Sequence, residues 1–294
     1  MVLKIITIYI FFTHIFSDTF ETSWGKCTLL NHGFSFKNSD LISIIHNEIY
    51  QLESIYGTIP HDHFSISIVN DNKLKIFSNH WTWSLGITYN NPDRIIIKDP
   101  SLSKISKNKF VKVLKHELNH LMVNRYKYYF TIPRWFKEGF AMKYAEEISL
   151  NHKLSVAKNL YNEELYEIDK YTSFKNFTRY EFNFAYALSG VYILVLEKMY
   201  GYNTIDIIID NLKNGEKFTV AFYNATGKSL NHFKINSYEM IKDYIFWYKL
   251  IGLPNSLFSL MPLLLVIGFY IKSKRNKKIK EQWELEETLE NSIN

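Results

Sequence analysis

Two histidines and a glutamate with the spacing of a metal site lie near the middle of the chain. The segment His116-Glu117-Leu118-Asn119-His120 is an H-E-x-x-H run within a stretch of helical periodicity. Side chains four positions apart on a helix lie one above the other, so both imidazoles can reach one metal ion. Glu117 lies at the edge of the same face, where it can take a proton from a water molecule on that metal. The run therefore predicts two zinc ligands and a general base.

The residues around this run predict a buried amphipathic helix. Asn108 is a candidate N-cap at its start. An ordinary helix that carries two histidines is the alternative interpretation, and the residues downstream argue against it. Apolar residues recur at three- and four-residue steps and form one stripe, made of Phe110, Val113, Leu114, Leu118 and Leu121.

A zinc site with two histidines needs a third protein ligand, and Glu138 is the candidate. Pro133 suits the entry to a second helix, in which Glu138 falls in the second turn. Gly139 and Ala141 are small, so we expect this helix to approach the first one closely enough for Glu138 to reach the metal. A fourth position left for water would make the site catalytic rather than structural.

Two further glutamates are alternatives for the third ligand. Glu146 and Glu147 follow two turns after Glu138 in the same predicted helix. Their position is typical of a solvent-exposed helix end, which favours Glu138 as the ligand.

The two motifs together resemble a known group of enzymes. H-E-x-x-H followed by the W-F-x-E-G-x-A of residues 135–141 is similar to the gluzincin metallopeptidases, and most similar to the peptidase MA-like domain among them. The likeness covers roughly residues 85 to 235 and includes a helix that ends in Tyr200-Gly201, but Ser237-Tyr238 stand where the family usually has a Trp. The resemblance implies a zinc peptidase with ligands His116, His120 and Glu138 and with Glu117 as base.

Gluzincins commonly use a Tyr or His to donate a hydrogen bond to the oxyanion of the tetrahedral intermediate. Tyr186, near the start of the predicted helix that ends at Tyr200, is the best candidate, with Tyr180 next. Such a donor is worth on the order of 3 kcal/mol in comparable sites. The chain holds 21 Tyr residues, so a place in the core is the alternative role for Tyr186.

The two ends of the chain predict a single-pass membrane protein. Residues 1–17 combine Lys4 with a short apolar run, which predicts a signal peptide, with a buried strand as the alternative. Residues 250–271 are uncharged and long enough to cross the ~30 Å hydrocarbon core, with a buried core helix as the alternative. The basic cluster at 272–280 opens a charged tail, 272–294, and predicts that this tail is cytoplasmic and the catalytic domain extracytoplasmic.

Charge and cysteine content narrow the possible partners. The net charge is +6, but the cluster after residue 271 explains most of it, so the sequence indicates no nucleic-acid surface. Contact with a lipid bilayer is the expected role of that cluster. Cys27 is the only cysteine, which excludes a disulfide within the chain.

Residues 18–249 predict one α+β domain, a small N-terminal mixed sheet followed by a mainly helical gluzincin-type catalytic part, ahead of the transmembrane helix. A helix is expected at 40–56 and strands at 64–69, around 74–77, at 86–89 and at 94–97. Residues 81–89 would line the cleft, and their strand could bind a peptide by edge pairing. The cluster at 61–63, His-Asp-His, predicts a surface turn more than a second metal site.

The function expected from the sequence is a membrane-anchored zinc-dependent peptidase that acts on a peptide or protein substrate outside the cytoplasm. The alternative is a non-catalytic, membrane-anchored binding or scaffold protein that keeps a gluzincin-like metal site. The complete set of two histidines, base and third carboxylate favours the enzyme.

Overall fold

A five-stranded mixed sheet forms the N-terminal part of the computed structural model, which describes residues 16–33, 35–57, 63–69, 84–161, 178–251 and 255–293. Its strands lie in the order β1-β2-β3-β5-β4. The three central strands are parallel, whereas both edge strands are antiparallel to their neighbours. The strands are β1 (Phe16–Thr22), β2 (Gly25–Asn31), β3 (His63–Val69), β4 (Gly86–Asn90) and β5 (Asp93–Lys98).

Isoleucine-rich strands attach the sheet to the helices. Ile95 and Ile97 of β5 belong to the main core, together with apolar residues of the helices, while Ile96 faces the opposite side beside Val69. A strand that buries side chains on both faces carries a continuous apolar run, as β5 does. The sheet and the helices that carry the site therefore share one hydrophobic core.

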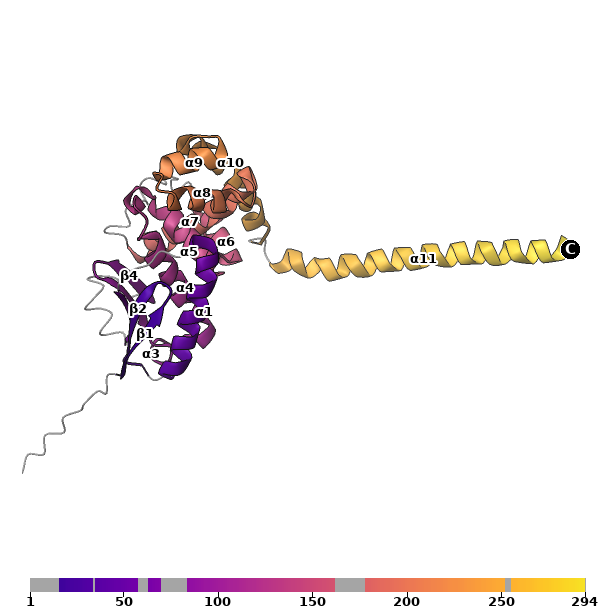
Figure 1. Ribbon diagram of the computed structural model, residues 1–294. Helices are drawn as coiled ribbons and strands as arrows, with labels where there is room; N and C mark the ends of the chain where they lie inside the picture. The colour runs from indigo at the N-terminus through magenta and orange to yellow at the C-terminus, as the bar shows by residue number, and fades with distance from the viewer. Residues whose placement is uncertain are drawn as a thin grey trace, which may run out of the picture. The chain divides into compact units, whose positions relative to one another are not determined.

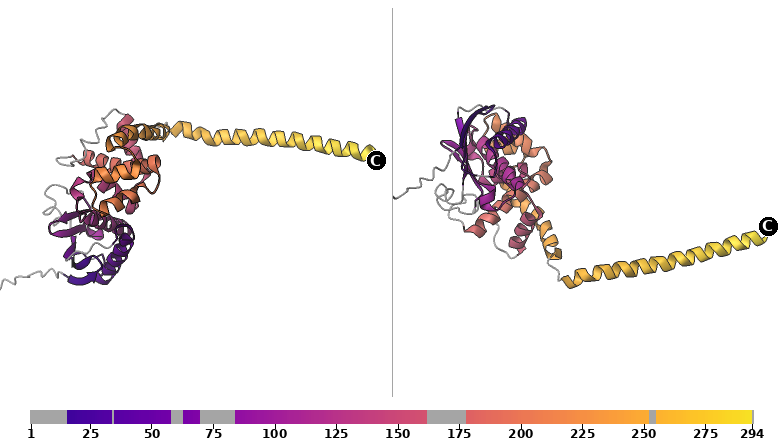
Figure 2. Two further views of the ribbon diagram at one scale, coloured as in Figure 1. Left: turned by 45° about the horizontal axis from the view of Figure 1, so that its top comes forward. Right: turned by 90° about the horizontal axis from the view of Figure 1, so that it is seen from below.

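Helices dominate the chain after the sheet, as predicted (Figure 1). Figure 2 shows the indigo and purple strands and the first helix on one side of residues 16–245 and the orange helices on the other. The helices are α1 (Asn38–Tyr56), α3 (Pro100–Ser103), α4 (Lys107–Val123), the 3-10 turn η1 (Tyr129–Thr131), α5 (Arg134–Tyr144), α6 (Leu150–Tyr161), α7 (Arg179–Tyr200), α8 (Thr204–Lys213), α9 (Phe218–Thr226), α10 (Leu230–Ile251) and α11 (Asn255–Ile293).

Helix α4 carries the H-E-x-x-H run and begins slightly earlier than expected. Its N-cap is Ser106 rather than Asn108, because the Ser106 hydroxyl accepts a hydrogen bond from the Lys109 backbone N–H at 3.1 Å. The predicted apolar stripe is confirmed, since all five of its residues are buried. This burial packs α4 against the sheet, while His116 and His120 line the cleft.

Gly139 has a different role from the one predicted. A Cβ at Gly139 would lie 2.2 Å from the backbone oxygen of Ser189 and 2.6 Å from a side-chain carbon of Ile193, both on α7. The missing side chain therefore permits close packing of α5 on α7, not on α4. Ala141 is fully buried in the same helix.

Several expectations concern residues at the N-terminal end or in the gaps. Residues 1–15 of the expected signal peptide, the expected strand at 74–77 and positions 61 and 62 lie outside the described residues. Phe16 and Ser17 open β1 and pair with Asn31 and Leu30 of β2. His63 opens β3, where its Nε2 lies 2.9 Å from the Thr28 hydroxyl.

The predicted transmembrane helix at 250–271 is wrong. In the described ranges, no helix combines the length and the apolar character that a bilayer crossing needs. The predicted segment is divided, because α10 ends at Ile251 and α11 begins at Asn255. The uncharged part of α11 then ends at Ile271, which gives it a length of roughly 25 Å at 1.5 Å per residue, short of the ~30 Å hydrocarbon core.

The chain divides into two compact units, residues 1–245 and residues 246–294. Helix α11 makes up most of the second unit, and ion pairs Lys277–Glu281 and Lys280–Glu284 link successive turns of its charged half. The candidate site lies entirely within the first unit.

Candidate metal centre

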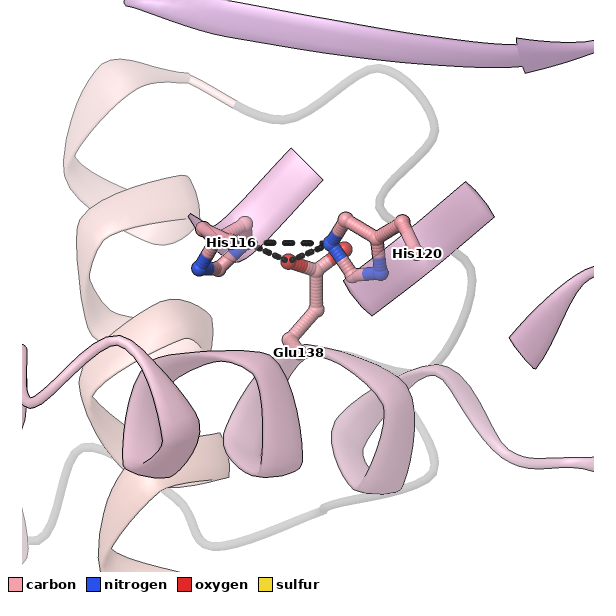
Figure 3. A group of neighbouring side chains, drawn as sticks. All are labelled: His116, His120 and Glu138. Atoms are coloured by element: carbon pink, nitrogen blue, oxygen red, sulfur yellow. Dashed lines mark hydrogen bonds and ion pairs between the residues drawn. The ribbon is translucent and has the colours of Figure 1, made fainter. Parts of the chain in front are cut away.

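Three side chains from two helices bring their ligand atoms together (Figure 3). The Nε2 atoms of His116 and His120 are 3.0 Å apart, and Glu138 Oε2 lies 3.5 Å and 3.4 Å from them. Ligands placed tetrahedrally at about 2.0–2.1 Å from a zinc ion are about 3.3 Å from one another. The triangle therefore has the size that a tetrahedral zinc site requires, and the predicted ligand set forms one group.

The two helices present these atoms from opposite sides. Figure 3 shows both imidazoles directed toward one another and Glu138 extending from α5 to lie between them. Arg134, one turn earlier on α5, donates from Nε to Glu138 Oε1 at 3.2 Å. This contact turns the other oxygen, Oε2, toward the histidines.

The charges around the histidines favour a cation between them. Burial lowers the pKa of His116, but the hydrogen bonds that it donates to the Glu138 and Glu147 carboxylates outweigh this and raise that pKa to about 10. Burial raises the pKa of Glu138, yet His120, His116 and Arg134 hold it well below its ordinary value. Without metal, protonated His116 supplies the positive charge that these carboxylates favour, and a divalent cation between the imidazoles would supply it instead.

Zinc affinity is expected to rise with pH. In the absence of metal, His116 with its pKa near 10 holds a proton that zinc must displace. One displaced proton raises the affinity about tenfold per pH unit between about pH 6 and pH 8. Competition with a coloured chelator at several pH values measures this slope, and a flat profile would show that no proton is released.

Glu147 lies at the candidate site, where the sequence analysis had expected a solvent-exposed helix end. Its side chain is only 5% exposed, whereas that of Glu146 is 82% exposed. Glu147 Oε2 lies 3.0 Å from His116 Nδ1, and Lys109 Nζ pairs with its Oε1 at 2.6 Å. A carboxylate on the far nitrogen of a metal-binding imidazole fixes the ring and its tautomer. Its position suits a residue that orients His116 rather than one that binds the metal itself.

The end of α5 explains how Glu147 reaches His116. Glu146 has φ +53°, a left-handed conformation that is uncommon outside glycine. The Glu147 N–H then bonds to the Met142 carbonyl and the Glu146 N–H to the Lys143 carbonyl, which is the Schellman pattern. Because glycine is absent here, the sequence carries no strong signal for this reversal.

Glu147→Gln is expected to weaken zinc binding by about 10- to 100-fold, the usual effect of losing a partner of a metal ligand. The amide can still contact His116, but it cannot pair with Lys109 or stabilise positive charge on the imidazole. Glu146→Gln is the matched control, because the neighbouring carboxylate is exposed. Equal zinc affinities of the two variants would contradict the role of Glu147.

Glu117 is held from strand β4. The Thr88 hydroxyl lies 2.6 Å from Glu117 Oε2 and 3.1 Å from the Glu117 carbonyl oxygen. Burial raises the pKa of Glu117, and this outweighs the opposite influence of His116, His120 and Thr88. A carboxylate with a raised pKa is better able to take up a proton and release it again near neutral pH.

Gly86→Ala is expected to displace this base. A Cβ at Gly86 would lie 2.6 Å from Glu117 Oε1 and 2.8 Å from its Cγ. Because the end of a flexible side chain can move, the fold should persist, while a displacement of about 1 Å can cost about 100-fold in rate. Turnover measured beside zinc content tests this, with Gly268→Ala as control because nothing lies within 4 Å of its Cβ position. Full activity of Gly86→Ala would show that Glu117 tolerates the shift.

Tyr186 lies at the site but is engaged with Glu147. Its hydroxyl donates to Glu147 Oε2 at 2.7 Å and lies 3.3 Å from His116 Nδ1. Burial and the Glu147 charge raise its pKa well above the ordinary value, so the phenol remains a donor. The oxyanion role stays a prediction. Tyr180 is 56% exposed, donates to Asn159, and is not among the residues of the cleft wall.

The metal centre lies in a cleft of about 790 Å³, large enough for a peptide segment. Residues 84–90 form one wall, which agrees with the expected cleft-lining strand for the part of 81–89 that the structure describes. His152, Phe182 and Asn183 contribute from α6 and α7. His152 Nδ1 accepts a hydrogen bond from the Ser149 backbone N–H at 3.1 Å.

No protein-family model matches the chain, and no curated protein matches it in sequence. Among solved structures, it is similar to an aminopeptidase N family protein from Idiomarina loihiensis, with 14% identity and a TM-score of 0.37. The match covers 79% of this chain and 42% of that one, so the chain spans less than half the length of that protein. The likeness is distant, and the chemistry rests on the site itself.

Proposed function

We propose that this protein is a zinc-dependent peptidase that hydrolyses peptide bonds. The observation that carries the proposal is the triangle of His116, His120 and Glu138 ligand atoms, 3.0–3.5 Å apart, with Glu117 beside it in a cleft. Three protein ligands leave one position of a tetrahedral ion for water or substrate, which is the arrangement of catalytic rather than structural zinc.

The reaction follows from the positions of the side chains. A zinc ion held by the three ligands would polarise the substrate carbonyl and lower the pKa of a water molecule toward neutrality. Glu117 takes the proton from this water as its oxygen bonds to the carbonyl carbon. The same carboxyl gives the proton to the amide nitrogen as the C–N bond breaks, so the base is regenerated. Thr88 keeps the Glu117 carboxylate in place through its 2.6 Å contact.

Among the described strands, β4 lies at the edge of the sheet, and this position suits an extended peptide. It pairs there with β5, and the Leu85 carbonyl accepts from the Lys98 N–H at 2.9 Å. In an antiparallel pair, alternate residues bond to the partner, so Gly86 and Thr88 direct their backbone groups away from β5. A substrate that adds a strand there would lie beside Glu117, because Thr88 contacts it directly.

Cleavage of casein by the purified protein, with and without a zinc chelator, tests the proposal. We expect about one zinc per chain, cleavage that stops on chelation, and recovery when zinc is added back. A protein that binds zinc at this site but leaves casein and a mixed peptide library intact would be the non-catalytic alternative. A protein that takes up no zinc would overturn the metal centre as well.

A further inference from the structure

Lys137 is a cation of the cleft wall that forms no ion pair among the described residues. It is half-buried on α5, one residue before Glu138, and it lines the cleft. Its Nζ lies 5.9 Å from the centre of the Tyr129 ring. Within the part of the chain that the structure describes, Lys137 makes no ion pair, and the negative charge that acts on it from a distance is that of Glu138, a residue of the metal centre.

The other charged groups of the described cleft wall are paired. Arg134 contacts Glu138, and Lys109 contacts Glu147. Glu117 is held by Thr88 at the place where it serves as base. Among the described charged residues of this wall, Lys137 is therefore the cation that no ion pair neutralises.

The acidic residues of the same wall indicate the sign of the charge that a ligand would carry. Among the described residues that line the cleft, the carboxylates are Glu117, Glu138 and Glu147, and each belongs to the metal centre. A substrate ammonium group would need a carboxylate that is not already engaged, and this wall offers none. A substrate carboxylate would find Lys137, with Arg134 one turn away on the same side of α5.

We infer that Lys137 is a specificity residue that pairs with a carboxylate of the substrate, either an acidic side chain or the free C-terminus. This inference rests on the proposed peptidase function and names the substrate class of that site. A cation in a partly desolvated cleft discriminates by charge more strongly than an exposed one, since less solvent and salt screen it.

Peptide binding to the zinc-loaded Glu117→Gln protein tests the inference, because this variant should bind substrates without consuming them. The probe is a neutral, amidated hexapeptide, compared with peptides that carry Glu in place of Gln at each position in turn and with the free-acid form. We expect at least one acidic peptide to bind about tenfold more tightly than the neutral one. A gain at an internal position identifies a side chain, and a gain only for the free acid identifies the C-terminus.

The preference should fall to about twofold or less when Lys137→Gln is added, and it should persist with Lys137→Arg. Lys127→Gln is the matched control, since Lys127 is exposed and does not belong to the described cleft wall. A preference that survives Lys137→Gln would overturn the inference. Equal binding of neutral and acidic peptides would overturn it too, yet leave the peptidase proposal standing. If no peptide binds the zinc-loaded protein, both fail.

Discussion

The Glu117→Gln variant is expected to lose about 1,000-fold in kcat/KM while it keeps its zinc. General acid–base catalysis contributes about 10²–10⁴-fold, and Glu117 serves in both directions of the proposed reaction. The amide has the shape of the carboxylate, and its carbonyl oxygen can still accept from Thr88, which lies 2.6 Å from Glu117 Oε2. What the variant lacks is the capacity to take up and return a proton.

Two measurements on the same preparation separate this effect from damage to the site. Zinc content by atomic absorption should stay at the wild-type value, because Glu117 is not among the three ligands. Turnover of a quenched fluorescent peptide should fall, whereas Glu146→Gln, an equal change at an exposed position, should leave it unaltered. Wild-type turnover in Glu117→Gln would reject Glu117 as the base.

The grouping of His116, His120 and Glu138 could be predicted because the signal for it is local. His116 and His120 are four apart on one helix, so any helix there stacks their imidazoles. Glu138 follows Pro133 at the start of the next helix, and its place in that helix is also local information. These patterns needed only the helical period, and the structure brings all three side chains together.

The residues that support the ligands depend on long-range contacts, which no local pattern encodes. Glu147 reaches His116 because the chain reverses at Glu146. A left-handed residue at such a reversal is usually glycine, and the glutamate here gives no sign of it in the sequence. Thr88 and Gly86 meet Glu117 across the gap between a sheet edge and a helix. A threonine and a glycine carry no special signal in the sequence, and their contacts with Glu117 follow from the packing of β4 on α4.

The transmembrane prediction failed for a related reason. The prediction rested on the uncharged length of residues 250–271, whereas the described helices end at Ile251 and begin again at Asn255. Composition alone does not locate helix ends inside such a segment. A similar limit applied to Gly139, whose small size was predicted correctly as a packing device but assigned to the wrong neighbouring helix.

Replacing Glu138 by Ala is expected to weaken zinc binding by more than the 10- to 100-fold of Glu147→Gln, to about 1,000-fold or beyond. The change removes a ligand and also the partner of Arg134, whose Nε lies 3.2 Å from Glu138 Oε1. The guanidinium would then stand beside the metal without a balancing charge, and two neutral imidazoles would have to hold the ion alone.

The fold should tolerate this substitution, because alanine has the highest intrinsic helix propensity and α5 keeps its apolar contacts. Circular dichroism before titration checks that point. The loss of zinc affinity should then be large for Glu138→Ala, intermediate for Glu147→Gln and negligible for Glu146→Gln. This order reflects the position of each carboxylate: Glu138 lies near His116 Nε2, Glu147 lies near His116 Nδ1, and Glu146 faces solvent. Undiminished zinc binding by Glu138→Ala would show that the third ligand has been misassigned. The position left for water would then have to be inferred again from the two histidines and a different third ligand.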